Sequence, residues 1–172
     1  MRMKSETNGP NQALRAALPS RHSMPNDYFA ELYVAGSIAK AGWNVYFPHR
    51  DKGFDFIISK LIDGKRWVVR PVQVKSKTPE TEATRPAYGY KGKLTAIHPE
   101  MLLAIPYFTA AVTGKPCCIA YMPFSRITAD KKGYHCQAAI LKASSVKPKP
   151  SLIRYFDESG IELMEAADWS TS

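Results

Sequence analysis

The sequence predicts an α/β fold, with one long helix followed by a small β-sheet and, near the C-terminus, an extra strand or two. Three observations support this prediction. Residues 27–41 are apolar at helical spacing, residues 43–48 and 54–58 are β-rich, and residues 67–75 form another β-rich run after the turn signal Asp63-Gly64. With 172 residues and 45% hydrophobic content, the chain is large enough for one domain with a buried core.

The expected helix has recognisable ends. Asn26 and Asp27 can cap its first turn, and Gly42 can close it. Its apolar residues cover most of its circumference, which predicts a well-buried helix. Glu31 lies on the same face as Val34 and Ile38. An acid in this position either reaches water at the edge of the core or points toward a polar site in the sheet.

Two predicted strands flank the Asp63-Gly64 turn, and both carry polar residues that a purely structural hairpin does not need. Asp55 interrupts the apolar run 54–58, and the second strand ends in Gln73-Val74-Lys75. Because side chains alternate along a strand, Gln73 and Lys75 share one face of the sheet. A carboxylate, an amide and an ammonium group on an apolar sheet are costly to bury unless they are paired or bind a metal ion.

The length of the hairpin loop decides whether Asp55 can join the other two polar residues. A two-residue loop would turn Asp55 to the face opposite Gln73 and Lys75. A three-residue loop with Gly64 in the left-handed conformation would place all three on one face, and so would a bulge near Pro71. A site here therefore requires an odd loop or a bulge.

The order of these features resembles the PD-(D/E)XK nuclease superfamily, in its Holliday-junction-resolvase-like and restriction-endonuclease-like branches. In that family an acid stands at the head of one strand and an acid-x-Lys triplet stands on the next. Here the triplet reads Gln73-Val74-Lys75, a known Gln-x-Lys variant. The resolvase-like branch also carries a glutamate on the first core helix, and Glu31 matches it. The resemblance covers residues 27–125.

This resemblance implies a restriction-endonuclease-like core of a helix, a three-stranded meander, a second helix and a strand, within a nuclease-like domain at residues 26–142. It also implies a metal-dependent hydrolase of nucleic-acid phosphodiesters that uses Mg²⁺ or Mn²⁺. Lys75 would hold the attacking water or the phosphoryl oxygens. The implied catalytic residues are Glu31, Asp55, Gln73 and Lys75, and the implied oxygen ligands of the cation belong to Asp55, Glu31, Gln73 and the main chain of Val74.

The remaining segments are less specific. Residues 1–25 are predicted to form a mobile arm. An apolar segment at 99–111 predicts a helix that breaks at Pro106, or a helix followed by a strand. The three cysteines lack the spacing of a metal site and are expected to be buried strand residues. Further strands are expected at 117–122, 134–141 and 152–156, the last of them within a linker and acidic tail at 143–172.

The charge distribution points to a polyanionic partner. The net charge is +9, and the last 18 residues hold five of the 15 acids and no Lys or Arg, so residues 1–154 carry 24 basic and 10 acidic residues, a net +14. Nucleic acid, DNA in the first place, is the expected partner. Basic and aromatic residues that could contact phosphates and stack on bases are interleaved downstream of the triplet, although a solvated loop explains them equally well: Lys77, Arg85, Tyr88, Tyr90, Lys91 and Lys93.

Neither a membrane-spanning apolar stretch nor a signal-peptide core is visible, so a cytoplasmic protein without a membrane partner is expected. The sequence leaves open whether the chain forms a homodimer. It also leaves three functions open. They are a metal-dependent hydrolase, a nuclease-fold protein that binds DNA or RNA without cutting, and an interaction or scaffold protein in which Asp55 and Lys75 form a buried ion pair.

Overall fold

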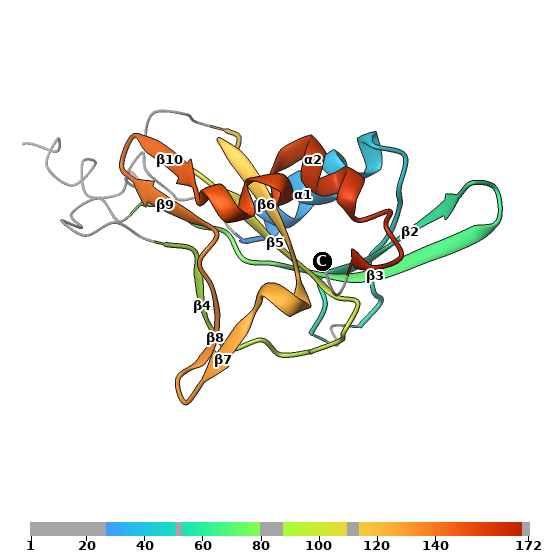
Figure 1. The fold of residues 1–172 in the computed structure, drawn as a ribbon, viewed down its shortest axis with the longest axis horizontal. Helices are drawn as coiled ribbons and strands as arrows, with labels where there is room; N and C mark the ends of the chain where they lie inside the picture. The colour runs from blue at the N-terminus through green and yellow to red at the C-terminus, as the bar shows by residue number, and fades with distance from the viewer. Residues whose placement is uncertain (1–26, 51–52, 80–87, 110–113, 170–172) are drawn as a thin grey trace, which may run out of the picture.

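The fold is built around a five-stranded mixed sheet with the strand order β1-β2-β3-β5-β6 (Figure 1). The computed structural model describes residues 27–50, 53–79, 88–109 and 114–169. The helices are α1 (Asp27–Lys40) and α2 (Asp157–Leu163), with two 3-10 helices, η1 (Phe124–Arg126) and η2 (Pro150–Tyr155). The central sheet contains β1 (Asn44–Tyr46), β2 (Phe56–Ile62), β3 (Arg66–Val74), β5 (Leu102–Tyr107) and β6 (Cys118–Pro123).

Two smaller sheets complete the described part of the chain. One has the order β4-β8-β7, and the other is the hairpin of β9 and β10. The bounds of these strands are β4 (Tyr90–Gly92), β7 (Thr128–Asp130), β8 (Gly133–Cys136), β9 (Ala139–Lys142) and β10 (Ser145–Pro148). The strand expected at 134–141 is therefore two strands, β8 and β9, that belong to different sheets.

Helix α1 ends where the sequence predicts. Gly42 adopts a positive φ of +84°, which a residue with a side chain tolerates poorly, and its N–H donates to the Ala39 carbonyl at 2.9 Å. The prediction that the whole helix is buried is wrong. Ala30, Val34, Ala35 and Ile38 are buried, but Leu32 on the opposite side is 44% exposed. The helix lies against only one side of the sheet, so its second apolar stripe faces solvent.

The hairpin of β2 and β3 has the odd loop that a polar site requires. Ile62 pairs with Arg66, which leaves Asp63, Gly64 and Lys65 in the loop, and the pairing continues in this register to Phe56 and Val72. Asp63 and Gly64 have φ values of +55° and +66°, so Gly64 is left-handed as predicted. The three-stranded antiparallel meander β1-β2-β3 that the sequence predicts is also present.

The connection from β3 to β5 differs from the expectation. Strand β5 runs parallel to β3, as a crossover requires, but the described part of the connection contains the short strand β4 and no helix. Residues 102–107 form a strand in which all six residues are buried, so the helix expected at 99–111 is absent over that stretch. A near-continuous apolar run suits a central strand that is covered on both faces. The other α-helix within the described ranges, α2, comes later in the chain, after β10 and η2, and packs on β6.

The C-terminal segment belongs to the packed fold. Tyr155, Met164 and Trp169 are fully buried, which contradicts the expectation of a linker and tail after residue 142. Arg70 on β3 explains part of this packing, because its buried guanidinium donates to the carbonyls of Met164 and Ala166 at 2.8 and 2.9 Å. The strand expected at 152–156 is also wrong, since residues 150–155 form η2 and a single bridge joins Phe156 to Ala120.

Two further findings concern the cysteines and the helices of the described residues. Only Cys136 is buried, while Cys118 is half-buried and Cys117 is exposed, so the prediction of three buried cysteines is wrong for Cys117. None of the helices in the described ranges is long and apolar enough to cross a membrane. The predicted arm at residues 1–25 lies outside the described residues.

Candidate functional site

Asp55 stands at the head of β2, where the ladder with β3 becomes irregular. Its N–H donates to the Val72 carbonyl at 2.9 Å, although the strand partner of Val72 is Phe56. Two residues opposite one partner are the mark of a β-bulge, which re-aims a side chain. The Asp55 carboxylate accepts the N–H of Val74 at 2.5 Å. It therefore occupies the place beside β3 where a main-chain carbonyl would otherwise continue the sheet.

Gln73 lies near this carboxylate, because it directly precedes Val74, whose N–H the Asp55 carboxylate accepts. Its side chain is 2% exposed. The amide nitrogen donates to the Gly53 carbonyl at 2.6 Å and to the Thr95 hydroxyl at 3.0 Å. Since the Gly53 carbonyl can only accept a hydrogen bond, the amide cannot be flipped without placing two oxygens against each other. Its orientation is therefore determined.

The amide oxygen of Gln73 takes no part in these hydrogen bonds. Oε1 is buried and has no hydrogen-bond partner among the residues that the structure describes. An unsatisfied buried acceptor costs about 1–3 kcal/mol, so such atoms are rare and call for an explanation. A bound cation or an ordered water would satisfy the atom. Gln73, one of the metal ligands that the family resemblance implies, thus has a buried amide oxygen without a partner among the described residues.

Lys75 follows the end of β3. Its main-chain N–H donates to the Ala104 carbonyl of β5 at 2.9 Å, and alternation along the strand turns its side chain to the face from which Gln73 leaves. The residue is half-buried. Within the described ranges, no hydrogen bond or ion pair of its ammonium group is found. Lys75 is therefore available to an anionic group at this end of the sheet.

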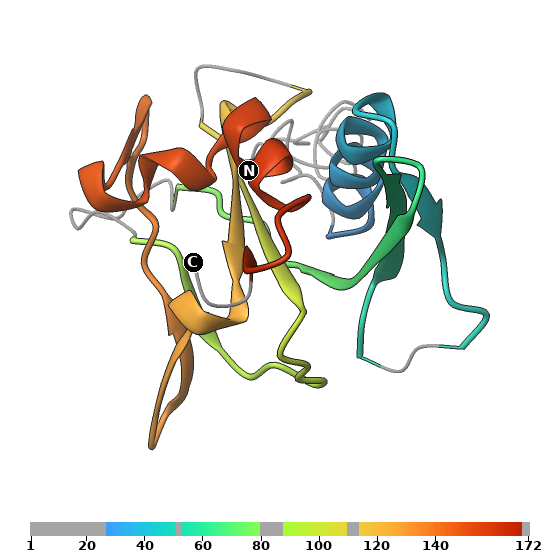
Figure 2. The same ribbon diagram turned by 45° about the vertical axis from the view of Figure 1, so that its right-hand side comes forward.

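Glu31 approaches from the other face of the sheet. At the two ends of α1, the Asp27 carboxylate accepts the Ser76 hydroxyl at 3.1 Å, and the Ala41 carbonyl accepts Lys60 Nζ at 3.0 Å. Helix α1 thus lies over the face that carries Val72 and Val74, beside the meander (Figure 2). Glu31 is half-buried, one helical turn from Asp27, on the side that meets the end of β3.

The four predicted site residues therefore do not all lie beneath α1. Gln73 leaves the opposite face, because Val72 and Val74 occupy the positions that point toward α1. Lys75 follows Gln73 by alternation. Asp55 and Gln73 meet through the main chain at the head of β2, since Gln73 bonds the Gly53 carbonyl and Asp55 bonds the Val74 N–H, while Glu31 and Lys75 flank them from the two sides of the sheet. Any common site must lie at the end of β3 and not on one face.

The donor types at this point suit a hard cation. Carboxylate, amide and carbonyl oxygens are the ligands that Mg²⁺ prefers. No group of three or more His, Cys, Asp or Glu side chains is placed to hold a metal ion among the described residues. A cation here would depend on Asp55, Gln73 and main-chain oxygens, with Glu31 as a further carboxylate. The unpaired Oε1 of Gln73 is the observation that favours it.

The predicted nucleic-acid contacts have mixed outcomes. Lys91 and Lys93 are exposed, and Tyr88 is 44% exposed, so these three can reach a partner. Tyr90 is only 8% exposed and its hydroxyl donates to the Lys93 carbonyl at 2.5 Å, so the stacking role predicted for it is wrong. Lys77 is half-buried and extends the pairing of β3 with β5 through its main chain. Arg85 lies outside the described residues.

Sequence reasoning missed the residues that orient Gln73. Gly53 and Thr95 come from two separate segments, and only the tertiary structure brings them to one amide. Gly53 has a φ of +90°, and a Cβ added to it would lie 2.8 Å from the Ala96 Cβ. Only glycine fits at this position. A glycine directly before the β-rich run 54–58 is the local signal that could have drawn attention to it.

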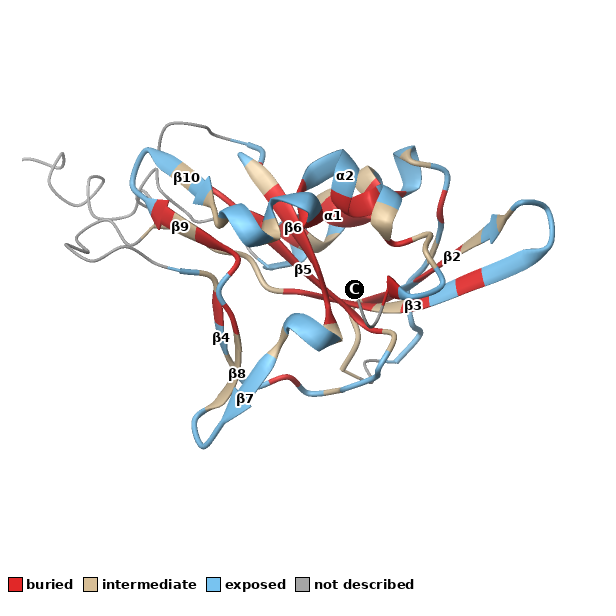
Figure 3. Cartoon of the chain, viewed as in Figure 1, coloured by how far each residue is buried: buried red, intermediate tan, exposed pale blue. Residues whose placement is uncertain are grey.

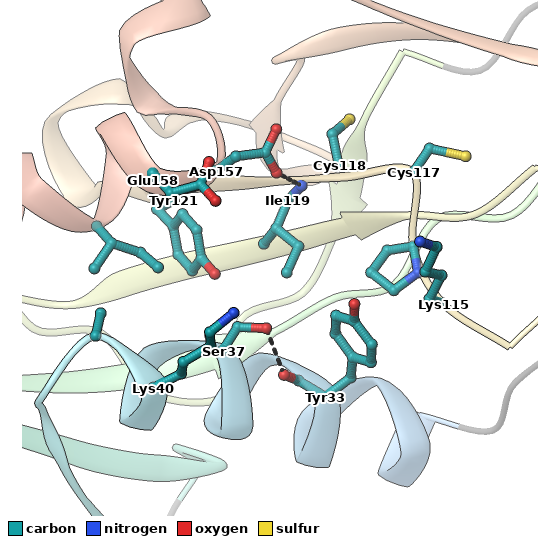
Figure 4. Close-up of a pocket in the computed structure, with 13 residues that line it drawn as sticks. Tyr33, Ser37, Lys40, Lys115, Cys117, Cys118, Ile119, Tyr121, Asp157 and Glu158 are labelled. Carbon is teal, nitrogen blue, oxygen red and sulfur yellow. Dashed lines mark hydrogen bonds between the residues drawn. The ribbon is translucent and has the colours of Figure 1, made fainter.

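A second feature absent from the sequence analysis is a cleft of about 670 Å³ between α1, the start of β6 and α2 (Figure 4). Lys40 and Tyr33 from α1 face Tyr121 and Asp157 across it. Asp157 has a φ of +50°, and its carboxylate accepts the Ile119 N–H at 2.9 Å. Partial desolvation raises the pKa of Asp157, and burial, followed by the charges of Asp157 and Glu158, raises the pKa of Tyr121. None of Asp55, Gln73 and Lys75 lines this cleft.

No family model matches this chain, no curated protein is significantly similar to it in sequence, and no solved structure matches its fold. The function must therefore be argued from the geometry of the chain itself.

Proposed function

We propose that the chain is a metal-dependent hydrolase of nucleic-acid phosphodiesters, with its site at the end of β3. The observation that carries the proposal is the buried, unpaired Oε1 of Gln73 beside the Asp55 carboxylate. Folding leaves this acceptor unsatisfied, and a divalent cation with oxygen ligands would satisfy it. The three-residue hairpin loop, which a site of this kind needs, supports the same proposal.

The residues would divide the work as follows. Asp55, already held by the Val74 N–H, supplies a fixed carboxylate oxygen, and Gln73, held by Gly53 and Thr95, supplies an amide oxygen. A cation in this place would lower the pKa of the attacking water and stabilise the charge that develops on the phosphate. Lys75 would position the phosphoryl oxygens as a point charge. Glu31 would add the negative charge that an amide at position 73 lacks.

The architecture agrees in part with the nuclease-like core. A first helix, a three-stranded meander and a following strand parallel to β3 occur in the expected order. The expected helix between β3 and β5 is absent from the described part of that connection. The excess of basic residues, +14 over residues 1–154, favours nucleic acid as the substrate, because Lys and Arg contacts to phosphates supply most of the affinity.

The first experiment measures cleavage of duplex, branched and single-stranded oligonucleotides with Mg²⁺ or Mn²⁺. Asp55→Asn and Lys75→Ala should each lower the rate by at least about a hundredfold, as loss of a charge-stabilising group does. Asp55→Asn keeps an oxygen that can accept the Val74 N–H, so its fold should persist. Lys65→Ala, in the exposed hairpin loop, is the matched control and should cleave normally. Equal cleavage by wild type and Asp55→Asn would place the activity elsewhere.

A second candidate function is nucleic-acid binding without cleavage. Two observations favour it, namely the amide at position 73 and the use of the Asp55 carboxylate as a main-chain acceptor. The variant Gln73→Glu separates the candidates. Its carboxylate would face the Gly53 carbonyl in place of the present 2.6 Å hydrogen bond, so the metal-free variant should be less stable than wild type.

Metal addition then decides between the two. If the site holds a cation, Mg²⁺ or Mn²⁺ should restore the thermal stability of Gln73→Glu and raise that of wild type, by about 2.7 kcal/mol at a hundredfold excess over Kd. If neither protein responds to either metal while both bind DNA at low salt, the protein binds without cutting. The third alternative, an interaction or scaffold protein with a buried Asp55–Lys75 ion pair, needs no metal ion, so it too predicts that neither Mg²⁺ nor Mn²⁺ changes the stability.

A further inference from the structure

The meander β1-β2-β3 has an apolar face that none of the described residues covers. We call it the outer face and define it by Tyr46, Ile57, Leu61, Trp67 and Val69. The register places them together, because Tyr46 pairs with Ile57 and Leu61 with Trp67, while Val69 pairs with Ser59 between them. Their exposed fractions are 53%, 38%, 42%, 58% and 53%. Figure 3 shows the loop end of the β2–β3 hairpin largely in the colour of exposed residues.

The opposite face of the same strands is an ordinary core face. Phe56, Ile58 and Val72 are fully buried there, and α1 covers them. An antiparallel sheet with one covered face normally shows polar residues on the other. Here both faces are apolar, as in a strand that is covered on both sides. The outer face therefore has the residue composition of a buried surface, although no described residue packs on it.

The size of the outer face suits a weak interface. Its five residues expose roughly 500 Å², given that an aromatic residue alone presents about 150–250 Å². Two copies packed together would remove roughly 1,000 Å², which is the lower bound for a specific protein–protein interface. Two sheets can pack face to face at a separation of about 10 Å with their strands nearly aligned. Such a contact would be symmetric, with the same patch used by both partners.

The lack of charged residues on the outer face indicates which kind of partner could bind there. Val69 pairs with Ser59 and Ile57 with Pro71, and Ser59 pairs in turn with Asn44, so none of these eight positions is charged. Nucleic acid would require Lys or Arg contacts to its phosphates, and these eight positions supply none; Lys75 lies beyond them, past Pro71. Two copies of a chain with a net charge of +9 repel each other least where they meet through an uncharged surface.

We propose that two copies of this chain associate through their outer faces. Gln73 and Lys75 leave β3 on the same face, beyond Pro71, so the two polar clusters would stand at the margins of one interface. The proposal does not depend on hydrolase activity, since it rests on the apolar residues alone. In this proposal the meander has two roles, because it supports the polar site and also forms the dimer interface.

Tryptophan fluorescence offers a test on the unmodified protein. Of its three tryptophans, Trp43 and Trp169 are 3% and 0% exposed, so Trp67 is the one that solvent reaches. On dilution, the emission should shift to longer wavelength and acrylamide quenching should increase as Trp67 becomes exposed. Sedimentation velocity on the same samples should show a dimer that dissociates in parallel. A monomer at every concentration would overturn the proposal.

A matched pair of variants locates the interface. Trp67→Glu should eliminate the dimer, whereas Ile153→Glu, at a site in η2 that is 61% exposed, should leave it unchanged. Both sites are exposed, and unchanged thermal unfolding of the monomer would show that the fold persists. A dimer that survives Trp67→Glu would place the interface elsewhere. A monomeric wild type that loses affinity for single-stranded DNA on Trp67→Glu would assign the outer face to nucleic acid and refute self-association.

Discussion

Strands β5 and β2 belong to the same sheet but face different surroundings. All six residues of β5 are buried, because β3 and β6 flank it and other elements cover both of its faces. In β2, Phe56 and Ile58 are buried while Ile57 and Leu61 on the other face are exposed. Both strands are mainly apolar, although β2 also contains Ser59 and Lys60. An apolar strand sequence thus shows that the strand can be buried. Whether it is buried depends on the elements that pack against it.

The largest expected effect tests this contrast with one substitution at two places. Leu103→Ala in β5 removes a fully buried side chain and should lower the free energy of unfolding by about 2–5 kcal/mol. Leu61→Ala in β2 alters a residue that is 42% exposed and should cost less than about 1 kcal/mol in the monomer. Urea denaturation at low protein concentration measures both. Equal losses would show that the outer face is already covered within the monomer.

A second, intermediate effect compares two arginines on β3. Arg70 is 1% exposed and bonds two carbonyls and the carboxylate of Glu100, whereas Arg66 is exposed and bonds the Glu165 carbonyl at 3.0 Å. Burial lowers the pKa of Arg70, and Glu100 opposes that shift. Arg70→Met leaves buried carbonyls unpaired and should cost about 1–3 kcal/mol.

The control for this prediction is Arg66→Met. Because its guanidinium is exposed, its loss should change the free energy of unfolding by less than about 0.5 kcal/mol. Chemical denaturation monitored by circular dichroism gives both values. If the two variants lost the same stability, the C-terminal segment would not depend on Arg70 for its attachment to β3.

The smallest expected effect concerns the cleft beside α2. The pKa of Asp157 is raised by partial desolvation, so the folded protein binds this proton more tightly than the unfolded chain. Its ionisation therefore opposes folding, and stability should fall as pH rises from the unfolded carboxyl value of about 3.9 through the higher folded pKa. Asp157→Asn removes this loss, keeps an acceptor for the Ile119 N–H and suits the positive φ.

The gain for Asp157→Asn at neutral pH should be below about 1 kcal/mol, because the residue remains exposed to solvent. The measurement is the difference in unfolding free energy between variant and wild type from acid to neutral pH. The difference should grow with pH through the acidic range and then level off. A constant difference would attribute the effect to the backbone conformation alone, and Glu158→Gln serves as the control at the neighbouring position.

Much of the site's framework could be predicted from local patterns. The end of α1 at Gly42, the meander and the odd hairpin loop follow from capping, alternation and turn chemistry, which act between residues close in sequence. The condition of an odd loop or a bulge was derived from register alone. Whether Gln73 points toward α1 or away from it could not be derived in the same way, since this depends on which side of the sheet α1 packs against.

The sequence by itself determined where the strands and α1 form and which residues can meet across the hairpin. Only the tertiary structure decided that Gly53 and Thr95 hold the Gln73 amide, that Arg70 anchors the C-terminal segment, and that no described residue covers the outer face. The reason is physical. Local structure depends on neighbours along the chain, whereas the satisfaction of a buried amide or guanidinium and the cover of an apolar face depend on segments tens of residues away.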